Sequence, residues 1–185
     1  ALTKTGLVMV AGEVSTSTYV EIPAIVRRTI RAIGYTSSEM GFDGTTCGVI
    51  VAIEGQSGDI AQGVDGQGVY TRDEQGAGDQ GMMFGYACDE TKELMPMPIT
   101  LAHRLTRRLA YVRKKKILEF VRPDGKSQVS VRYVDDRPVA VDAVVLSTQH
   151  APDAKYKTLR ESIMEEVIRK EIPAHLIGPK TKYYI

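Results

Sequence analysis

The sequence predicts an α+β fold, in which strands pair around helices in two separate segments of the chain. Runs of strand length and amphipathic helical patterns occur on both sides of a glycine-rich stretch, Gly55 to Asp79. The apolar content, 43% of 185 residues, is sufficient for a packed core, and 25% charged residues is ordinary for a soluble domain. We find no internal sequence repeat strong enough to assert.

The first segment contains two predicted strands and one predicted helix. Leu7 to Val14 and Cys47 to Glu54 are apolar runs typical of buried strands. Between them, Ile22 to Ile33 has apolar residues at helical spacing. Pro23 suits the first turn of that helix and Gly34 suits its end, because proline lacks only an unused donor there and glycine tolerates the left-handed cap.

The glycine-rich stretch from Gly55 to Asp79 has few apolar residues among its Gln, Asp and Ser. Such a segment buries too little surface to offset its ordering entropy, so we expect it to be mobile without ligand. Long loops of this kind are often binding loops, and this one is also the natural domain boundary.

The second segment begins with the clearest helical pattern, Ile99 to Lys116, whose cations gather at the C-terminal end. Gln128 to Val134 and Val139 to Thr148 alternate as strands, and Asp135 to Pro138 is expected to join them as a hairpin turn. A last helix is predicted before Pro173. Its apolar positions are Leu159, Ile163, Val167 and Ile168.

Charge and cysteine content exclude several classes of protein. Lys plus Arg (24) nearly balance Asp plus Glu (23), so no global field favours nucleic acid or an anionic membrane. Cys47 and Cys88 match no metal-binding spacing, and no apolar signal segment is present, so a cytoplasmic, reducing compartment is the default. The longest apolar run, Cys47 to Ile53, is too short to span a bilayer. Because strand-like residues stand at both ends, we expect a piece of a longer protein.

The glycines Gly76, Gly78 and Gly81 match the dinucleotide-binding pattern G-x-G-x-x-G, but their context does not. The residues before them, Tyr70 to Gln75, are polar rather than a buried strand, and no acidic residue stands near Met97, where the ribose contact would be. P-loop, H-E-x-x-H and G-x-S-x-G motifs are absent, and the three histidines are scattered.

Two polar runs have ordinary structural interpretations. The basic residues between Arg104 and Lys116 could hold phosphate or RNA. No aromatic stacking platform interleaves these charges, so a solvated helix face with a cationic C-terminal turn is favoured. Arg122 to Lys126 contains Pro-Asp-Gly, which predicts a hairpin turn without any ligand.

The stretch GAGDQGMMFGYA, Gly76 to Ala87, resembles the signature of the S-adenosylmethionine synthetases, also called methionine adenosyltransferases. The resemblance covers residues 1–185 and follows the family's order. The other matching segments are KTGLVMVAGEV, IGYTSSEMGFDG, QSGDIAQGV, LMPMPITLAHRL, RPDGKSQV and DAVVLSTQH.

The resemblance implies a transferase of S-adenosylmethionine biosynthesis and one-carbon metabolism, which joins ATP, methionine and water into S-adenosylmethionine, phosphate and diphosphate. The attacking thioether sulfur has no proton to lose, so that step needs no general base. It needs alignment with the ribose C5′ and neutralisation of the departing triphosphate. This chemistry is consistent with the absence of a catalytic triad.

The resemblance also implies site residues. Glu13 and Gln56 are expected at methionine. Asp79 is expected to be a catalytic aspartate beside methionine or ATP, contributed across a dimer interface. Asp124, Gly125 and Lys126 are expected at ATP, with Lys126 catalytic.

The implied organisation is the S-adenosylmethionine synthetase fold, with repeated units of mixed or antiparallel sheet and helices packed on one face. Residues 1–56 would belong to the N-terminal domain, 57–72 to a mobile active-site loop, and 73–185 to the central domain.

The implied cofactors are Mg²⁺ and K⁺, and their expected ligands lie outside this chain. The implied partners are ATP, methionine and further copies of the protein, as a homodimer or homotetramer with sites between subunits. The family's His-Pro-Asp-Lys motif and potassium-binding Glu would precede residue 1, and its later phosphate-binding Asp and Arg-Lys pair would follow residue 185. The chain alone would then carry half a site and be inactive. The alternative is a non-catalytic structural or partner subunit of the same fold, against which the presence of Glu13, Asp79 and Lys126 counts.

Overall fold

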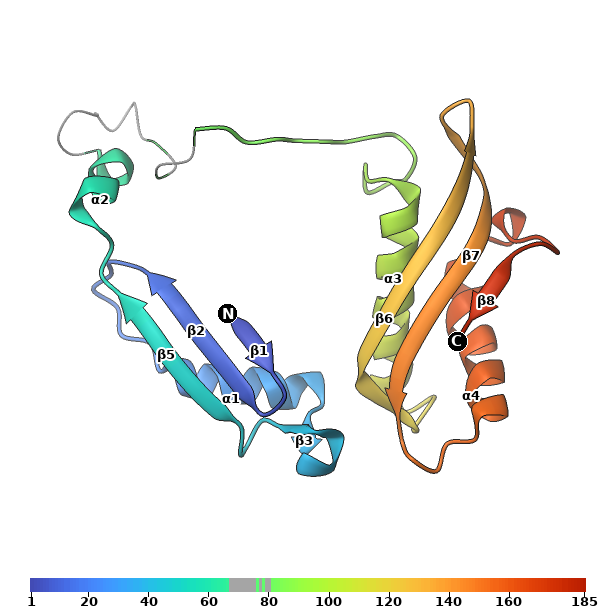
Figure 1. Cartoon of the computed structure of the whole chain (residues 1–185), viewed down its shortest axis with the longest axis horizontal. Helices are drawn as coiled ribbons and strands as arrows, with labels where there is room; N and C mark the ends of the chain where they lie inside the picture. Colours follow the sequence, from blue (N-terminus) through green and yellow to red (C-terminus); the bar gives the residue numbers. More distant parts are fainter. Residues whose placement is uncertain (67–75, 77, 79–80) are drawn as a thin grey trace. The chain divides into compact units, whose positions relative to one another are not determined.

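The computed structural model describes residues 1–66, 76, 78 and 81–185 of the chain. These residues form two compact units, Ala1–Gly85 and Tyr86–Ile185 (Figure 1).

Unit 1 is built on a three-stranded sheet of order β1-β2-β5, with β1 at Leu2–Lys4, β2 at Leu7–Glu13 and β5 at Gly48–Glu54. β1 pairs antiparallel with β2, and β2 pairs parallel with β5. The connection between the parallel strands contains helix α1, Ile22–Ile33, which has a proline in its first turn and Gly34 as its C-cap. The helix and the two longer strands predicted for this segment are therefore confirmed, but the strands are less buried than expected, since β2 buries only Val8 and β5 buries no residue.

Helix α1 covers one face of this sheet and encloses a small core. The fully buried apolar residues are Val8, Ile30 and Cys47. Gly44 lies so close to α1 that a Cβ would stand 2.9 Å from the carbonyl oxygen of Arg27 and 3.1 Å from the backbone nitrogen of Arg31. The Arg27 guanidinium donates to the carbonyl of Thr45 over 2.8 Å, which ties the helix to the turn before β5.

Short elements complete unit 1, and their small size explains why periodicity did not predict them. They are β3 (Thr36–Ser37), η1 (Ser38–Met40), β4 (Phe42–Asp43) and α2 (Gly58–Asp65). Helix α2 lies inside the glycine-rich stretch, where composition indicated no regular structure. Residues 67–72, the rest of the expected active-site loop, lie outside the described residues.

Unit 2 is a second three-stranded sheet of order β6-β7-β8, covered by helices. Its long strands are β6 (Val121–Val134) and β7 (Arg137–His150), which pair antiparallel, and the short β8 (Lys182–Tyr184) runs parallel to β7. The helical elements are α3 (Met97–Lys114), α4 (Tyr156–Ile163), the π-helical η3 (Met164–Ile168), α5 (Arg169–Glu171) and the 3-10 turn η4 (Ala174–Leu176).

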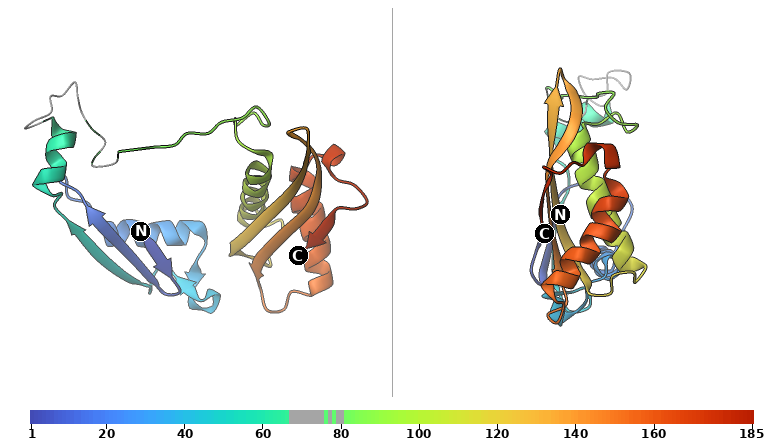
Figure 2. Two further views of the ribbon diagram at one scale, coloured as in Figure 1. Left: turned by 45° about the horizontal axis from the view of Figure 1, so that its top comes forward. Right: turned by 90° about the vertical axis from the view of Figure 1, so that its right-hand side faces the viewer.

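The core of unit 2 lies between this sheet and α3, α4 and η3, which pack on the same face (Figure 2, right). α3 buries Leu101, Leu105, Leu109 and Val112 against Val144 and Leu146 of β7. α4 and η3 add Leu159, Ile163, Val167 and Ile168, the four positions at which the sequence predicted a buried helix face. The α+β class, with mixed sheets and helices on one face, is confirmed.

One predicted turn is confirmed and another is wrong. Asp135 and Asp136 connect β6 to β7 with φ values of 48° and 57°, as a tight hairpin turn with two left-handed residues requires. Arg122 to Lys126, by contrast, lies within β6 rather than in a turn. The β6–β7 register shifts between Val121 and Gly125, and this irregularity accommodates Pro123, which has no amide hydrogen for the ladder.

Candidate functional site

The structure brings Glu13 and Gln56 together, although 43 residues separate them in sequence. Glu13 is the last residue of β2, and Gln56 follows the end of the parallel neighbour β5 by two residues. The carboxyl ends of adjacent parallel strands meet at one edge of a sheet, where open α/β sheets commonly bind ligands. The Gln56 side-chain amide donates to a Glu13 carboxylate oxygen over 3.2 Å. Glu13 is exposed and Gln56 is half-buried, so both can reach a ligand.

Two hydrogen bonds continue the β2–β5 pairing past the ends of the strands and fix this arrangement. The Val14 backbone amide donates to the carbonyl of Glu54 over 2.9 Å. The Gln56 backbone amide donates to the Ser15 hydroxyl over 3.1 Å. Ser15 was not singled out from the sequence, because nothing local distinguishes it from the other hydroxyl residues of the STST run.

Asp124 and Lys126 lie two residues apart on β6, so their side chains leave the same face of the strand. Both are exposed. The intervening Gly125 faces the opposite way, toward α3, where a Cβ would stand 2.6 Å from Cδ2 of Leu109. The carboxylate and the ammonium therefore share the sheet face that the helices leave uncovered.

The remaining predicted site residue, Asp79, lies outside the described residues. Glu13 and Gln56 belong to unit 1, whereas Asp124, Gly125 and Lys126 belong to unit 2. The structure thus groups the predicted methionine contacts in one unit and the predicted ATP contacts in the other.

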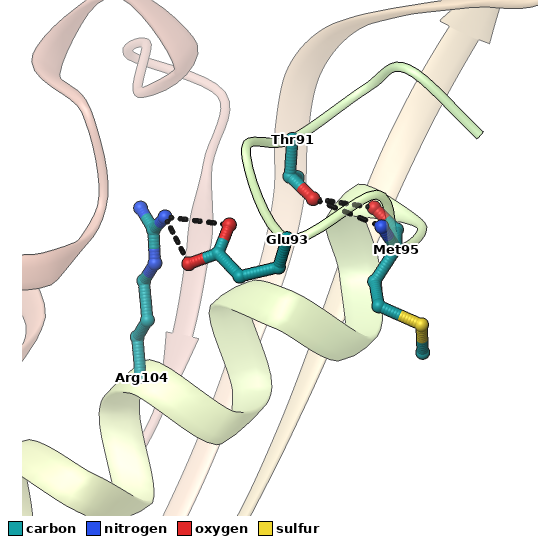
Figure 3. Close-up of polar contacts among 4 residues, drawn as sticks. All are labelled: Thr91, Glu93, Met95 and Arg104. Atoms are coloured by element: carbon teal, nitrogen blue, oxygen red, sulfur yellow. Dashed lines mark hydrogen bonds and ion pairs between the residues drawn. The ribbon is translucent and has the colours of Figure 1, made fainter. Parts of the chain in front are cut away.

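Some of the basic side chains of α3 are engaged in local contacts within unit 2. The Arg104 guanidinium donates to both oxygens of Glu93, at 3.0 and 3.3 Å (Figure 3). In the same loop the Thr91 hydroxyl bonds to the backbone of Met95, which shapes the chain before the helix (Figure 3). Arg108 donates to the carbonyl of Glu166 over 2.8 Å. These contacts favour the structural interpretation of the run.

Glu90 forms a separate polar cluster at the start of α3. Its carboxylate accepts from the Tyr133 hydroxyl at 2.6 Å and from the backbone amide of Met97 at 2.8 Å, which satisfies a free donor of the helix's first turn. The Tyr133 hydroxyl, followed by the Met97 amide, holds the pKa of Glu90 below its usual value. Burial and the bond to Glu90 raise the pKa of Tyr133 to about 12. The cluster stabilises the junction between the loop and the β6–β7 hairpin.

Unit 2 also has an open cavity of about 250 Å³ at the carboxyl end of β7. Ser147, Thr148, His150 and Tyr156 are among its lining residues. Neither Asp124 nor Lys126 lines it, so we assign it no part in the candidate site.

The described part of the chain has neither a ready-made metal cluster nor a helix able to cross a membrane. It contains no group of three or more His, Cys, Asp or Glu side chains placed to hold a metal ion. The residues described here therefore provide no cage for Mg²⁺ or K⁺, and we derive no step through either ion. Within the same residues, no helix has both the length and the apolar character needed to cross a bilayer.

Comparison with known families assigns both units. Residues 1–58 match the family described as S-adenosylmethionine synthetase, N-terminal domain. Residues 74–185 match S-adenosylmethionine synthetase, central domain. Together the two matches cover the sheets of both units and their described helices except α2, of which only residue 58 is matched.

Individual relatives give the same result. The chain is 60% identical over 185 residues to the S-adenosylmethionine synthase of Syntrophobacter fumaroxidans, and covers 47% of that protein. It is 61% identical over 184 residues to the enzyme of Myxococcus xanthus strain DK1622, of which it covers 45%, and 56% identical over 185 residues to that of Desulfosudis oleivorans, of which it covers 47%. In each comparison the whole of this chain is matched, so the chain spans about half the length of these relatives. The chain belongs to the S-adenosylmethionine synthetase family.

Proposed function

We propose that the full-length protein carrying this chain is a methionine adenosyltransferase, which converts ATP, L-methionine and water into S-adenosylmethionine, phosphate and diphosphate. The methionine sulfur donates a lone pair to the ribose C5′, and the bond from C5′ to the triphosphate oxygen breaks. The triphosphate leaves with that electron pair and is then hydrolysed by water. The sulfur becomes a sulfonium without any proton transfer.

The observation that carries this proposal is the pairing of Glu13 with Gln56 at the carboxyl ends of β2 and β5. An amino acid presents an ammonium and a carboxylate. A glutamate and a primary amide held 3.2 Å apart match these two groups, since the carboxylate accepts from the ammonium and the amide donates to the carboxylate. We assign both residues to methionine binding.

We assign Asp124, Gly125 and Lys126 to ATP. Lys126 supplies a positive charge toward the triphosphate, where charge builds up as the C5′–O bond breaks, and Asp124 accepts hydrogen bonds from the nucleotide. Their common direction from β6 supports one shared ligand. Asp79 is proposed as a further catalytic group. Mg²⁺ and K⁺ are proposed to complete the site, and a divalent cation would neutralise phosphate oxygens when bound with ATP.

We further propose that the protein self-associates as a homodimer or homotetramer. The face of the unit 1 sheet opposite α1 carries Leu2, Met9 and Ile50, which are 60%, 37% and 48% exposed. An apolar sheet face of this kind is typical of an interface between subunits. Cys47 and Cys88 are both free thiols, which is consistent with the proposed cytoplasmic location.

The methionine assignment is tested by Glu13→Gln in the full-length protein. We expect the KM for methionine to rise at least about tenfold while the KM for ATP changes little, because only the ammonium contact loses its charge. Glu21→Gln is the matched control, since Glu21 is an exposed carboxylate of the same unit that accepts from the Tyr19 hydroxyl. Equal effects of the two substitutions would refute the assignment.

The ATP assignment is tested by Lys126→Met. If Lys126 acts on transition-state charge, kcat should fall by about 100-fold or more while the affinity for ATP falls much less. Lys182→Met is the control, because Lys182 is a lysine on the same sheet face as Lys126 but on another strand. Lys182 of β8 pairs with Ala143 of β7, which pairs with Ser130, four residues after Lys126 on β6. Full activity of the Lys126→Met protein would refute the catalytic role assigned to Lys126. Absence of synthase activity in the unsubstituted full-length protein would favour the non-catalytic alternative.

The 185-residue chain by itself is proposed to be inactive, because the phosphate and cation ligands that the family resemblance implies lie outside it. Incubation of the purified chain with ATP, methionine, Mg²⁺ and K⁺, followed by chromatography for S-adenosylmethionine, tests this. Product above the no-protein blank would show that the chain holds a complete site.

A further inference from the structure

The inward-facing residues of β6 suggest how Lys126 is held in place. Gly125, Ser127 and Val129 alternate with Asp124, Lys126 and Gln128 along the strand. The first three face α3, as shown by the near-contact of Gly125 with Leu109 and by the burial of Val129. The other three are exposed on the opposite face. Whatever fixes the inward residues therefore fixes the direction of Lys126.

Ser127 makes the one polar contact of this strand segment with the helix that the described residues show. Its hydroxyl donates to the carbonyl oxygen of Ala102 over 2.7 Å, between elements 25 residues apart in sequence. Ala102 is itself buried in the middle of α3, so its carbonyl is a fixed reference point. On its other side Ser127 registers with Leu146 of β7, which is fully buried.

Gly125 lets this part of β6 lie close to α3 without displacing Leu109. Because a Cβ at that position would stand 2.6 Å from Leu109, only glycine lets the strand approach the helix this closely without a shift. Because β6 lies so close to α3, the Ser127 hydroxyl reaches the backbone carbonyl of Ala102 in the helix. The two residues that flank Lys126 in sequence thus both pack on α3: Gly125 allows the close approach, and Ser127 makes the hydrogen bond.

We infer that Ser127 is a positioning residue for Lys126: its bond to Ala102 sets the rotation of β6 that aims the ammonium at the triphosphate. This inference rests on the proposed role of Lys126. Phosphate charge stabilisation depends steeply on placement, and a shift of about 1 Å can cost about 100-fold in rate. Ser127 faces α3 and not the exposed face that carries Lys126, so its effect on the reaction must pass through Lys126.

The test compares Ser127→Ala and Ser127→Thr in the full-length protein. Ser127→Ala should lower kcat about tenfold and leave the KM for methionine unchanged, because the methionine contacts lie in the other unit. Ser127→Thr keeps the hydroxyl and suits a strand, so kcat should return to within about twofold of the parent value. If the threonine variant is as slow as the alanine variant, the inference is wrong.

A matched control separates positioning from general destabilisation. Thr181→Val removes another half-buried hydroxyl-to-carbonyl bond of the same unit, from Thr181 to Val141 over 2.8 Å, at a site away from Lys126 on β6. It should leave kcat unchanged. An equal loss of kcat in the Thr181→Val and Ser127→Ala proteins would overturn the inference.

The double variant Ser127→Ala/Lys126→Met distinguishes this inference from the proposed function. It should be no slower than Lys126→Met alone. Once the lysine charge at position 126 has been removed, shifting that position can reduce kcat no further. Independent, multiplying losses would overturn the positioning role of Ser127 while leaving Lys126 in its own role. If Lys126→Met itself is fully active, the role assigned to Lys126 fails, and with it the positioning role of Ser127, while the synthase activity stands. Should Ser127→Ala not fold, Ser127→Cys, a weaker donor of similar size, replaces it in the same cycle with the same criterion.

Discussion

Units 1 and 2 share one connectivity but differ in how much they bury. In each, an antiparallel strand pair is followed by helix and then by a third strand parallel to the second: β1-β2-α1-β5 in unit 1 and β6-β7-α4-β8 in unit 2. Among the residues that the structure describes, unit 1 has three buried core residues, whereas unit 2 has seventeen. The difference arises because unit 2 has α3 as a second covering helix and strands twice as long.

The uncovered faces of the two sheets also differ, in the polarity of the side chains that they present. In unit 1 the uncovered face presents Leu2, Met9 and Ile50, while in unit 2 it presents Asp124, Lys126 and Gln128. One connectivity therefore supports an apolar face suited to association and a polar face suited to a charged ligand. What each sheet does depends on the residues of its outer face rather than on its topology.

The largest expected effect tests the difference between the two cores. Leu105→Ala removes a fully buried side chain of unit 2 and should cost about 3–4 kcal/mol of unfolding free energy. Ile30→Ala in unit 1 should cost about 2 kcal/mol, because its small, open core can collapse around the lost volume. Hydrogen exchange followed by mass spectrometry reports each unit separately. A larger loss for Ile30→Ala would show that unit 1 is the better packed of the two.

A second pair of substitutions compares glycines packed against helices. Gly44→Ala should destabilise unit 1 by about 2–3 kcal/mol, because the new methyl meets the backbone of α1, which cannot yield. Gly125→Ala should cost about 1 kcal/mol, since the atom it meets is the end of the Leu109 side chain, which can change rotamer. Denaturant titration measures both, with Gly85→Ala as control because nothing lies within 4 Å of its added methyl. Reversal of the order would mean that the Leu109 packing is the more rigid.

The Glu90–Tyr133 cluster should make the stability of unit 2 depend on pH more strongly than the exposed Tyr19–Glu21 pair does in unit 1. The pKa of Glu90 is lower in the folded state, so its contribution is fully present above the pKa of the unfolded carboxyl and is lost as pH falls through the folded value. Glu90→Gln should therefore flatten the fall in melting temperature of unit 2 between about pH 5 and pH 3. At high pH the raised pKa of Tyr133 acts oppositely, and its contribution is lost as pH rises from 10 toward about 12. An unchanged acid limb in the Glu90→Gln protein would contradict the assignment.

The smallest effect is expected at the exposed ion pair of the β6–β7 hairpin. Arg137 and Asp89 stand 3.3 Å apart, with side chains 69% and 79% exposed. Arg137→Ala should change the unfolding free energy by less than about 0.5 kcal/mol, because water and salt screen such a pair. A loss well above this in a double-mutant cycle with Asp89→Ala would show that the pair anchors the loop before α3.

Sequence patterns predicted the parts of the fold that depend on local periodicity. The bounds of α1, the strands β2 and β5, and the buried face of α4 and η3 follow from apolar spacing, because one face of each must be buried. The turn predicted from Pro-Asp-Gly at 122–126 was wrong, because β7 continues to pair with β6 beyond these residues. A register shift in the pairing accommodates the proline. β1, β3 and β4 are too short for a periodic signal.

The candidate site divides in the same way. Glu13, Gln56, Asp124 and Lys126 were expected from a family resemblance, which depends on residue types in order. Ser15 and Ser127 could not be expected, because their significance lies in partners distant in sequence, Gln56 and Ala102.

The sequence by itself determined the class of fold, the major helices and strands, and the family, since each depends on patterns within short stretches of chain. Only the tertiary structure decided that β2 and β5 run parallel, which places Glu13 beside Gln56. It also decided that Ser127 meets α3 while Lys126 faces away. The physical reason is that strand pairing and helix packing join residues through the shape of the whole core, and that shape is not encoded at either residue alone.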